Sequence, residues 1–256
     1  MKYALLIGIN YKGTSAELNG CINDINNTKE MLVNIYNYQE ENIIVLTDES
    51  EIKPTHDNII YHLNKISNTI DATQIWISYS GHGSYLRDRN GDEDDGKDEC
   101  LVPLDYDKKG MIRDDDINKI LCQINEITNV IVIIDACHSE TMIDLPYRYI
   151  SGIKSVIENN KCNIKCNCIM ISGCRDNQTS ADAYSINNSK EYSGAMTTSL
   201  LHVLKKYNYN ITCWRLLKKM RKFLQNKQFS QVPHICCSKK LNNHTLFTLK
   251  NFFSYL

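Results

Sequence analysis

Short apolar segments alternate with amphipathic segments along most of this 256-residue chain. The apolar segments are nearly continuous, and the one at 130–134 consists of β-branched residues, which is typical of strands buried on both faces of a parallel sheet. They lie at 3–9, 43–46, 75–79, 130–134 and 168–173. Because helical segments separate them, the pattern favours βαβ units. The sequence therefore predicts an α/β fold, in one domain over residues 1–256.

The helical periodicity places five helices between or after these strands. They are predicted at 21–36, 55–70, 117–124, 194–207 and 212–224, with Thr55 as the N-cap of the second. A short strand is predicted at 100–104, and an edge strand at 245–249. The segment 85–99 is polar and acidic, and 141–167 is the least regular part of the chain. We expect this second segment to be a surface connection.

Composition narrows the choice of partners and location. The net charge is −1 and 23% of the residues are charged, which gives no argument for a nucleic-acid or anionic-membrane partner. No apolar segment approaches the roughly 20 residues of a membrane-spanning helix, and the first one is too short for a secretion signal. We expect a soluble, cytoplasmic protein. Its 11 irregularly spaced cysteines are then expected to be free thiols.

Two of the predicted strands end in reactive residues. The strand at 130–134 is followed by Asp135, Cys137 and His138, and the strand at 75–79 leads to His82, which lies between two glycines. Open α/β sheets place their reactive groups at the carboxyl ends of parallel strands. A thiolate is a strong nucleophile, and a nearby imidazole can take the thiol proton. We predict Cys137 as nucleophile and His82 as base; the simpler alternative is a buried cysteine and a loop histidine.

Acyl transfer also requires hydrogen-bond donors for the developing oxyanion. The N–H of Gly83, with that of Cys137, is the natural candidate. His138 is the less favoured base, because neighbours along an extended strand point to opposite faces. No third residue that would orient His82 can be named from the sequence.

Several ordered motifs resemble those of metacaspases, the caspase-like peptidases of plants, fungi, protists and bacteria. The segments that carry the resemblance are Tyr79 to Gly83 around the histidine, Asp135 to Ser139 around the cysteine, Ala4 to Tyr11, Leu18 to Asp24, and Ser172 to Ala183. The resemblance covers nearly the whole chain. It implies a caspase-like three-layer αβα sandwich with a mostly parallel central sheet. A large-subunit-like region would span about 1–150, a connection 151–167 and a small-subunit-like region 168–256.

The resemblance also implies an activity and a specificity pocket. The activity would be that of a cysteine endopeptidase acting on peptide or protein substrates after Arg or Lys. The pocket positions of the family correspond here to Cys21, Asp24, Ser80 and Asp135. Two carboxylates in a narrow pocket favour a guanidinium or ammonium group and repel an acidic side chain. The simpler alternatives are a surface helix carboxylate for Asp24 and a helix cap for Asp135, and without the resemblance the simpler alternative would be preferred for Asp24.

A calcium site is implied by the same resemblance. Its ligands would be Asp98, Asp114, Asp115 and Asp144. The acidic segment is not an EF-hand, because the required first Asp is missing in either alignment of its glycines. Carboxylates from separated loops can still bind a hard cation, and the alternative is a solvated acidic loop. The spacing of Cys162, Cys166, Cys168 and Cys174 does not match a zinc ribbon, so free thiols are favoured.

The chain departs from the family in three places. Glu140 replaces the glycine that usually follows Cys-His-Ser, and the connection where self-cleavage usually occurs is short, with Lys154, Lys161 and Lys165 as the remaining cleavage sites. The first strand begins at Tyr3, so the chain resembles a catalytic core without a pro-region. We expect a calcium-stimulated, monomeric peptidase. The alternatives are a non-catalytic caspase-like interaction module and an Asp-specific caspase.

Overall fold

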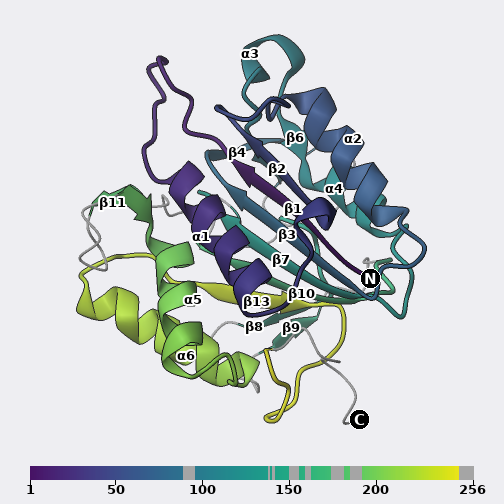
Figure 1. Ribbon diagram of the computed structural model, residues 1–256, viewed down its shortest axis with the longest axis vertical. Coiled ribbons are helices and arrows are strands. Elements are labelled where there is room, and N and C mark those ends of the chain that lie inside the picture. Colours follow the sequence, from purple (N-terminus) through teal and green to yellow (C-terminus); the bar gives the residue numbers. More distant parts are fainter. Residues whose placement is uncertain are drawn as a thin grey trace.

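An eight-stranded sheet organises the part of the chain that the computed structural model describes (Figure 1). The described residues are 1–88, 96–137, 139, 142–149, 156–158, 163–173, 182–184 and 192–247, with the backbone alone for 156–158 and 182–184. The strand order is β2-β1-β3-β7-β10-β13-β8-β9. The parallel strands are β1 (Lys2–Gly8), β2 (Ile43–Thr47), β3 (Gln74–Ser80), β7 (Asn129–Asp135) and β10 (Asn167–Ser172). The antiparallel extension is β13 (His234–Cys237), β8 (Tyr147–Tyr149) and β9 (Val156–Glu158).

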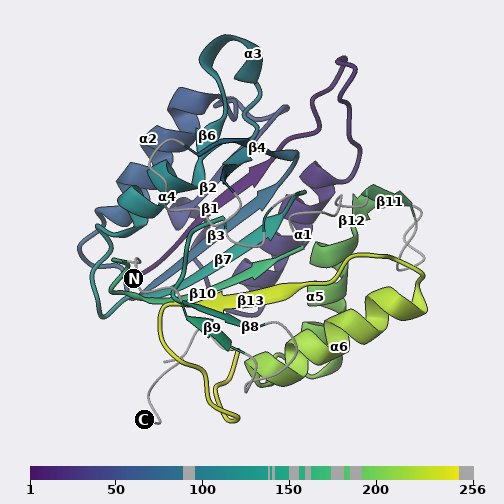
Figure 2. The same cartoon turned by 180° about the vertical axis from the view of Figure 1, so that it is seen from behind.

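Helices cover both faces of this sheet (Figures 1 and 2). One face carries α1 (Cys21–Asn34), α5 (Ala195–Lys206) and α6 (Cys213–Asn226), and the other carries α2 (His56–Ser67) and α4 (Asp114–Leu121). The predicted αβα sandwich with a mostly parallel sheet is therefore confirmed. The smaller elements are η1 (Glu40–Asn42), α3 (Tyr106–Lys109), a sheet of β4 (Gly83–Arg87), β5 (Lys97–Leu101) and β6 (Ile112–Arg113), and a pair of β11 (Asp182–Tyr184) and β12 (Tyr192–Gly194).

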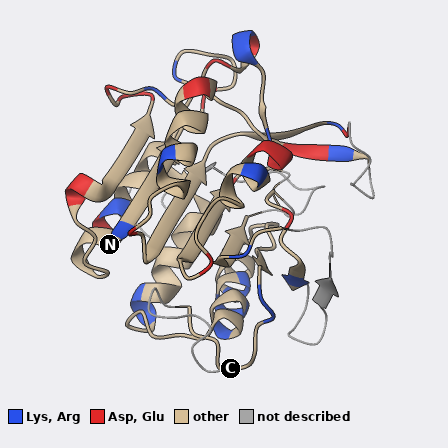
Figure 3. Cartoon of the chain, turned by 90° about the vertical axis from the view of Figure 1, so that its right-hand side faces the viewer, with Lys and Arg blue, Asp and Glu red and all other residues tan. Residues whose placement is uncertain are grey.

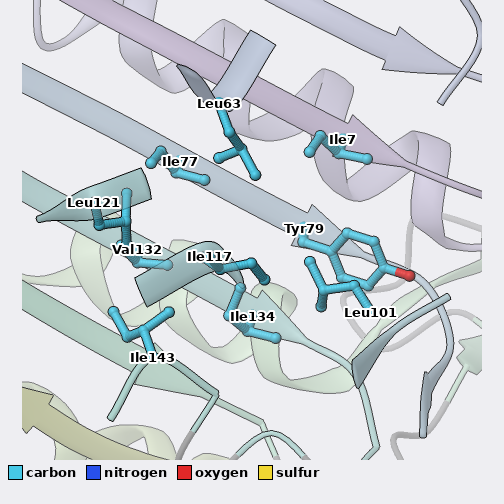
Figure 4. Close-up of a pocket in the computed structure, with 10 residues that line it drawn as sticks. All are labelled: Ile7, Leu63, Ile77, Tyr79, Leu101, Ile117, Leu121, Val132, Ile134 and Ile143. Carbon is cyan, nitrogen blue, oxygen red and sulfur yellow. The ribbon is translucent and has the colours of Figure 1, made fainter. Parts of the chain in front are cut away.

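The apolar strands build two cores because successive side chains point to opposite faces. In β1, Leu5 and Ile7 belong to the core under α2 and α4, whereas Ala4 and Leu6 belong to the core under α1, α5 and α6. Burial of both faces explains why these strands have no polar alternation. The pocket shown in Figure 4 lies within the first core. Its lining is aliphatic apart from Tyr79, so we assign it to core packing and not to substrate binding.

Three sequence expectations are corrected by the structure. The short strand predicted at 100–104 is β5, which begins at Lys97 and pairs with β4, and the segment 141–167, expected to be an irregular surface connection, contains β8 and β9 at the edge of the main sheet. The edge strand predicted at 245–249 is not found: Leu246 makes an isolated bridge to Thr212, and 248–249 lie outside the described residues. The sheet is extended by β13 instead. These short strands lack a long β-branched run, so their pairing depends on neighbours that are distant in sequence.

Two further expectations concern cysteines and membranes. Every cysteine in the described ranges is a free thiol, as predicted; Cys162 and Cys174 lie outside those ranges. Within the same part of the chain, none of the helices combines the length and the apolar character required to cross a bilayer. The N-cap prediction is also confirmed, because Thr55 accepts a hydrogen bond from the Asn58 N–H at 3.4 Å.

Candidate active site

The carboxyl ends of β3 and β7 bring the histidine and cysteine motifs together. The two strands are parallel neighbours, and their last paired residues are Ser80 and Asp135. His82 and Cys137 each come two residues after this last pair, so both lie beyond the same end of the sheet. The Gly81 N–H donates to the Asp135 carbonyl at 3.3 Å, which ties the two strand ends together. This pairing of β3 with β7 is the one expected if His82 and Cys137 belong to the same site.

Gly83 lies directly against the main chain of Cys137. A Cβ atom at Gly83 would lie 1.9 Å from the Cys137 carbonyl oxygen, so no larger residue fits here without a shift of the backbone. His82 accepts a bond from the Val102 N–H at 3.2 Å, and Gly83 is paired with Leu101 in the β4–β5 ladder. Because hydrogen-bonded and non-bonded pairs alternate in an antiparallel ladder, the Gly83 N–H points away from β5. This placement is consistent with the predicted oxyanion donor.

The imidazole of His82 is oriented by a main-chain carbonyl. Its Nε2 atom lies 2.8 Å from the carbonyl oxygen of Ala16, and its ring centroid lies 4.8 Å from that of Tyr11. A carbonyl oxygen only accepts, so Nε2 must carry a proton, and Nδ1 is the nitrogen that can take one from a thiol. Ala16 thus supplies the orienting group that the sequence did not identify. No residue-type signal exists for it, because every residue has the same carbonyl.

Cys137 begins the loop that follows β7 and is half-buried. Ser139 is fully buried, and its hydroxyl donates to the Ala136 carbonyl at 2.9 Å, which closes a tight turn around the cysteine. His138 and Glu140 lie outside the described residues.

Three of the four predicted pocket residues form one buried cluster. The Ser80 hydroxyl donates to Asp24 Oδ2 at 2.7 Å, the Gly194 N–H donates to Asp24 Oδ1 at 2.9 Å, and the Thr197 N–H donates to Asp135 Oδ2 at 2.8 Å. Gly194 is the N-cap residue of α5 and Thr197 lies in its first turn, which contains no acidic residue of its own. The two carboxylates therefore complement the positive end of this helix from other parts of the chain.

Gly194 lets both carboxylates approach its backbone closely, because it has no side chain. A Cβ atom there would lie 2.3 Å from Asp135 Oδ2 and 2.5 Å from Asp24 Oδ2. Gly173 approaches Asp135 in the same way, with 3.1 Å from its hypothetical Cβ to Oδ1. The sequence did not assign these glycines to the pocket, although Gly194 directly precedes a predicted helix. Cys21, the fourth predicted residue, is buried one helical turn before Asp24.

The predicted calcium ligands lie on neighbouring elements but have other partners. Asp98 forms an ion pair with Arg113, and Asp114 accepts from the Glu99 N–H at 2.8 Å. Acidic segments accordingly lie side by side around β5 and the start of α4 (Figure 3). Burial raises the pKa of Asp114 from its usual 3.8 to about 6. Asp115 lies 3.7 Å from the Lys119 ammonium group.

Asp144 comes from a different loop. It has a positive φ of 44°, and the carbonyl of the preceding Ile143 accepts from the Asn118 amide at 2.9 Å. This contact holds the loop against α4. Across the described ranges, however, no three or more His, Cys, Asp or Glu side chains are arranged to hold a metal ion. Because Asp98 already has a guanidinium partner, a calcium ion could bind these four residues only if the ion pair with Arg113 opened.

An αβα sandwich with a cysteine and a histidine at adjacent strand ends defines the class of caspase-like cysteine peptidases. Residues 2–146 match the family described as the metacaspase, peptidase C14 domain. The chain is 34% identical to metacaspase-3 of Trypanosoma brucei brucei, covering 98% of this chain and 75% of the relative. It is 33% identical to metacaspase-1 of Eremothecium gossypii, covering 96% and 66%. The chain belongs to the metacaspase family and is thus a caspase-like cysteine peptidase.

Solved structures support the fold. A crystal structure of a Geobacter sulfurreducens protein matches with a TM-score of 0.66 at 23% identity, covering 94% of both chains. Caspase-1 of Spodoptera frugiperda matches with a TM-score of 0.57 at 12% identity, covering all of this chain and 92% of the caspase. The predicted caspase-like architecture is therefore confirmed.

Proposed function

We propose that this protein is an endopeptidase that cleaves after Arg or Lys, with Cys137 as nucleophile and His82 as general base. The observation that carries the proposal is the buried pair of carboxylates formed by Asp24 on α1 and Asp135 at the end of β7, the strand that leads to Cys137. Both converge on Gly194, whose missing side chain lets their oxygens approach it closely. A substrate cation bound to them would form charge-assisted hydrogen bonds with two carboxylates, one of which lies two residues before the nucleophile.

The reaction follows from the roles of these groups. The Cys137 thiol gives its proton to His82 Nδ1, and the thiolate adds to the scissile carbonyl carbon. The Gly83 N–H donates to the resulting oxyanion. When the C–N bond breaks, the imidazolium returns its proton to the leaving amine, and an acyl-enzyme remains on Cys137. Water, deprotonated by His82, then hydrolyses the thioester and restores the thiol.

The test is hydrolysis of a fluorogenic peptide ending in Arg, compared with matched peptides ending in Asp and norleucine. Cleavage after Arg that is lost in Cys137→Ala is expected. Faster cleavage after Asp than after Arg would support the alternative of an Asp-specific caspase. Equal cleavage by Cys137→Ala would exclude Cys137 as the nucleophile. A thiol-reactive probe separates the enzyme from a non-catalytic module, because only the enzyme should show preferential, His82-dependent alkylation of Cys137.

Calcium stimulation and self-cleavage are further parts of the proposal. Since Asp98 is paired with Arg113, calcium would have to displace this guanidinium to use the predicted ligands. Peptidase assays with millimolar calcium and with a chelator would test stimulation, and equal rates would argue against it. A gel of calcium-treated protein would test cleavage at Lys165 and the other lysines of the connection, and an intact chain would contradict it. The cytoplasmic location and the monomeric state stay predictions.

A further inference from the structure

Two buried tyrosines lie beneath His82 and are not used by the proposed reaction. Tyr11 follows β1, and Tyr79 is the penultimate residue of β3; each has 1% of its surface exposed. Their hydroxyl oxygens are 3.1 Å apart. Figure 4 shows the Tyr79 ring at the end of the apolar core, with its hydroxyl directed away from the aliphatic side chains. Buried hydroxyls are costly unless they are hydrogen-bonded, so their partners are informative.

The partners of both hydroxyls include the backbone of the predicted base. Tyr79 donates to the His82 carbonyl at 2.7 Å, and the His82 N–H donates to the Tyr11 oxygen at 3.0 Å. Tyr11 in turn donates to the Val102 carbonyl at 2.6 Å. The Tyr11 hydroxyl thus bridges the His82 N–H and the Val102 carbonyl, two groups that an ordinary ladder would join directly. Both polar groups of the His82 backbone are therefore fixed by tyrosines.

The Tyr11 ring also contacts the imidazole. The two rings are tilted by 39°, with centroids 4.8 Å apart. Tyr11 itself has a positive φ of 51°, an unusual conformation for a bulky residue, so its placement is determined by the surrounding contacts. Burial raises the pKa of both tyrosines, so both hydroxyls stay protonated and keep their donor protons at any pH at which a peptidase works.

We propose that Tyr11 and Tyr79 are positioning residues that hold His82 in its catalytic orientation. They touch the histidine backbone and ring from below, while the Ala16 carbonyl holds Nε2. Neither hydroxyl has a place in the bond-breaking steps. The inference rests on the proposed function, because it assumes that His82 acts as the base.

The test uses Tyr79→Phe and Tyr11→Phe, which remove one hydroxyl each and keep the rings. The expected result is a fall of kcat by about 10- to 100-fold, because a small misplacement of a catalytic group has effects of this size. KM should change by less than about threefold, since neither residue belongs to the pocket. The rate of Cys137 alkylation by iodoacetamide should lose its His82-dependent pH profile in the same variants.

Tyr149→Phe is the matched control. Tyr149 is equally buried and its hydroxyl accepts the Leu241 N–H at 2.6 Å, but it lies on β8, beyond β10 and β13 from the active-site strands. This variant should lose thermal stability and keep kcat and the alkylation profile of the unaltered enzyme. If the two site variants behave like Tyr149→Phe, the positioning role is wrong.

A second perturbation covers the case in which the phenylalanine variants fold poorly. A Cβ at Gly81 would lie 2.8 Å from the Tyr79 hydroxyl and 3.1 Å from the Tyr11 hydroxyl. Gly81→Ala should therefore displace both hydroxyls and produce the same loss of kcat; unchanged kcat would overturn the inference. If the unaltered protein neither cleaves peptides nor shows His82-dependent alkylation, the proposed function fails and this inference fails with it. Normal activity with unaffected variants contradicts the inference alone.

Discussion

Two pairs of aspartates in this molecule are almost equally buried but are stabilised in different ways. Asp24 and Asp135 are 1% and 3% exposed, and Asp98 and Asp114 are each 2% exposed. The first pair accepts hydrogen bonds from a serine hydroxyl and from the N–H groups that begin α5. The second pair includes an ion pair to Arg113. Neutral donors stabilise a carboxylate without cancelling its charge, whereas a guanidinium cancels it.

This difference bears on which of the two pairs can bind a cation from outside the chain. In the first pair, both carboxylates converge on Gly194 and accept hydrogen bonds from a hydroxyl and from backbone N–H groups. In the second pair, Asp98 is bound to a guanidinium of its own chain, so any other cation must compete with it. The same residue type at the same burial thus differs in the chemistry of its partners.

The largest expected effect on activity comes from Asp135→Asn. The amide oxygen can still accept the Thr197 N–H, so the change removes mainly the charge. We expect kcat/KM for an Arg peptide to fall by about 100- to 1,000-fold, the cost of removing one partner of a buried charge pair. The exposed Asp116→Asn should leave the rate unchanged. An equal fall on a norleucine peptide would show that the charge does not carry specificity, which would break the comparison.

A smaller loss is expected for Gly194→Ala. The added methyl group would have to displace one of the two carboxylates or shift the start of α5, so we expect kcat/KM for Arg peptides to fall by about 10- to 100-fold. Gly110→Ala is the control: Gly110 has a φ of +85° and open space around it, so this change should cost stability without loss of activity. Full activity of Gly194→Ala would mean that the arrangement of the two carboxylates around Gly194 is not required for cleavage.

Arg113→Gln tests the second pair through stability. Removing the guanidinium leaves a buried carboxylate without its countercharge, which typically costs about 3–5 kcal/mol. The free energy of unfolding should fall by an amount of this order in calcium-free buffer. Asp98→Asn in the same background should recover much of the loss, because no charge is then left unpaired. Additive losses in the double variant would mean that the two residues are not energetically coupled.

The smaller of the two expected effects on stability is a pH dependence that Asp114 contributes. Burial raises the pKa of Asp114 to about 6. Between about pH 4 and 6, this carboxyl group is therefore protonated in the folded protein but already deprotonated in the unfolded chain. This contribution to stability is present below pH 4 and is lost as the pH rises through 6. Asp114→Asn cannot ionise, so the variant should gain about 1–3 kcal/mol relative to the unaltered protein between pH 4 and pH 7. Urea denaturation at several pH values, in buffer with a chelator, measures the difference in the free energy of unfolding between the two proteins. A difference that does not change with pH would show that Asp114 does not titrate in this range.

The sequence predicted the central strands because each is buried on both faces and consists of long apolar runs. β13, β8 and β9 were missed, since strands of three or four residues depend on their partners for identity. At the site, Cys137 and His82 could be found because strand ends and residue chemistry coincide. Asp24 and Asp135 required the family resemblance, as their shared contacts with α5 come from distant parts of the chain.

The carbonyl of Ala16 has a consequence for how this site can be dissected. An alanine scan has nothing to remove at a position that is already alanine, and any other residue would present the same oxygen to His82. The contribution therefore belongs to the path of the loop, which is closed by the bond from the Leu18 N–H to the Asn10 carbonyl at 2.8 Å. Only a change of the main chain, such as a one-residue deletion or an amide-to-ester replacement within this loop, would disturb it.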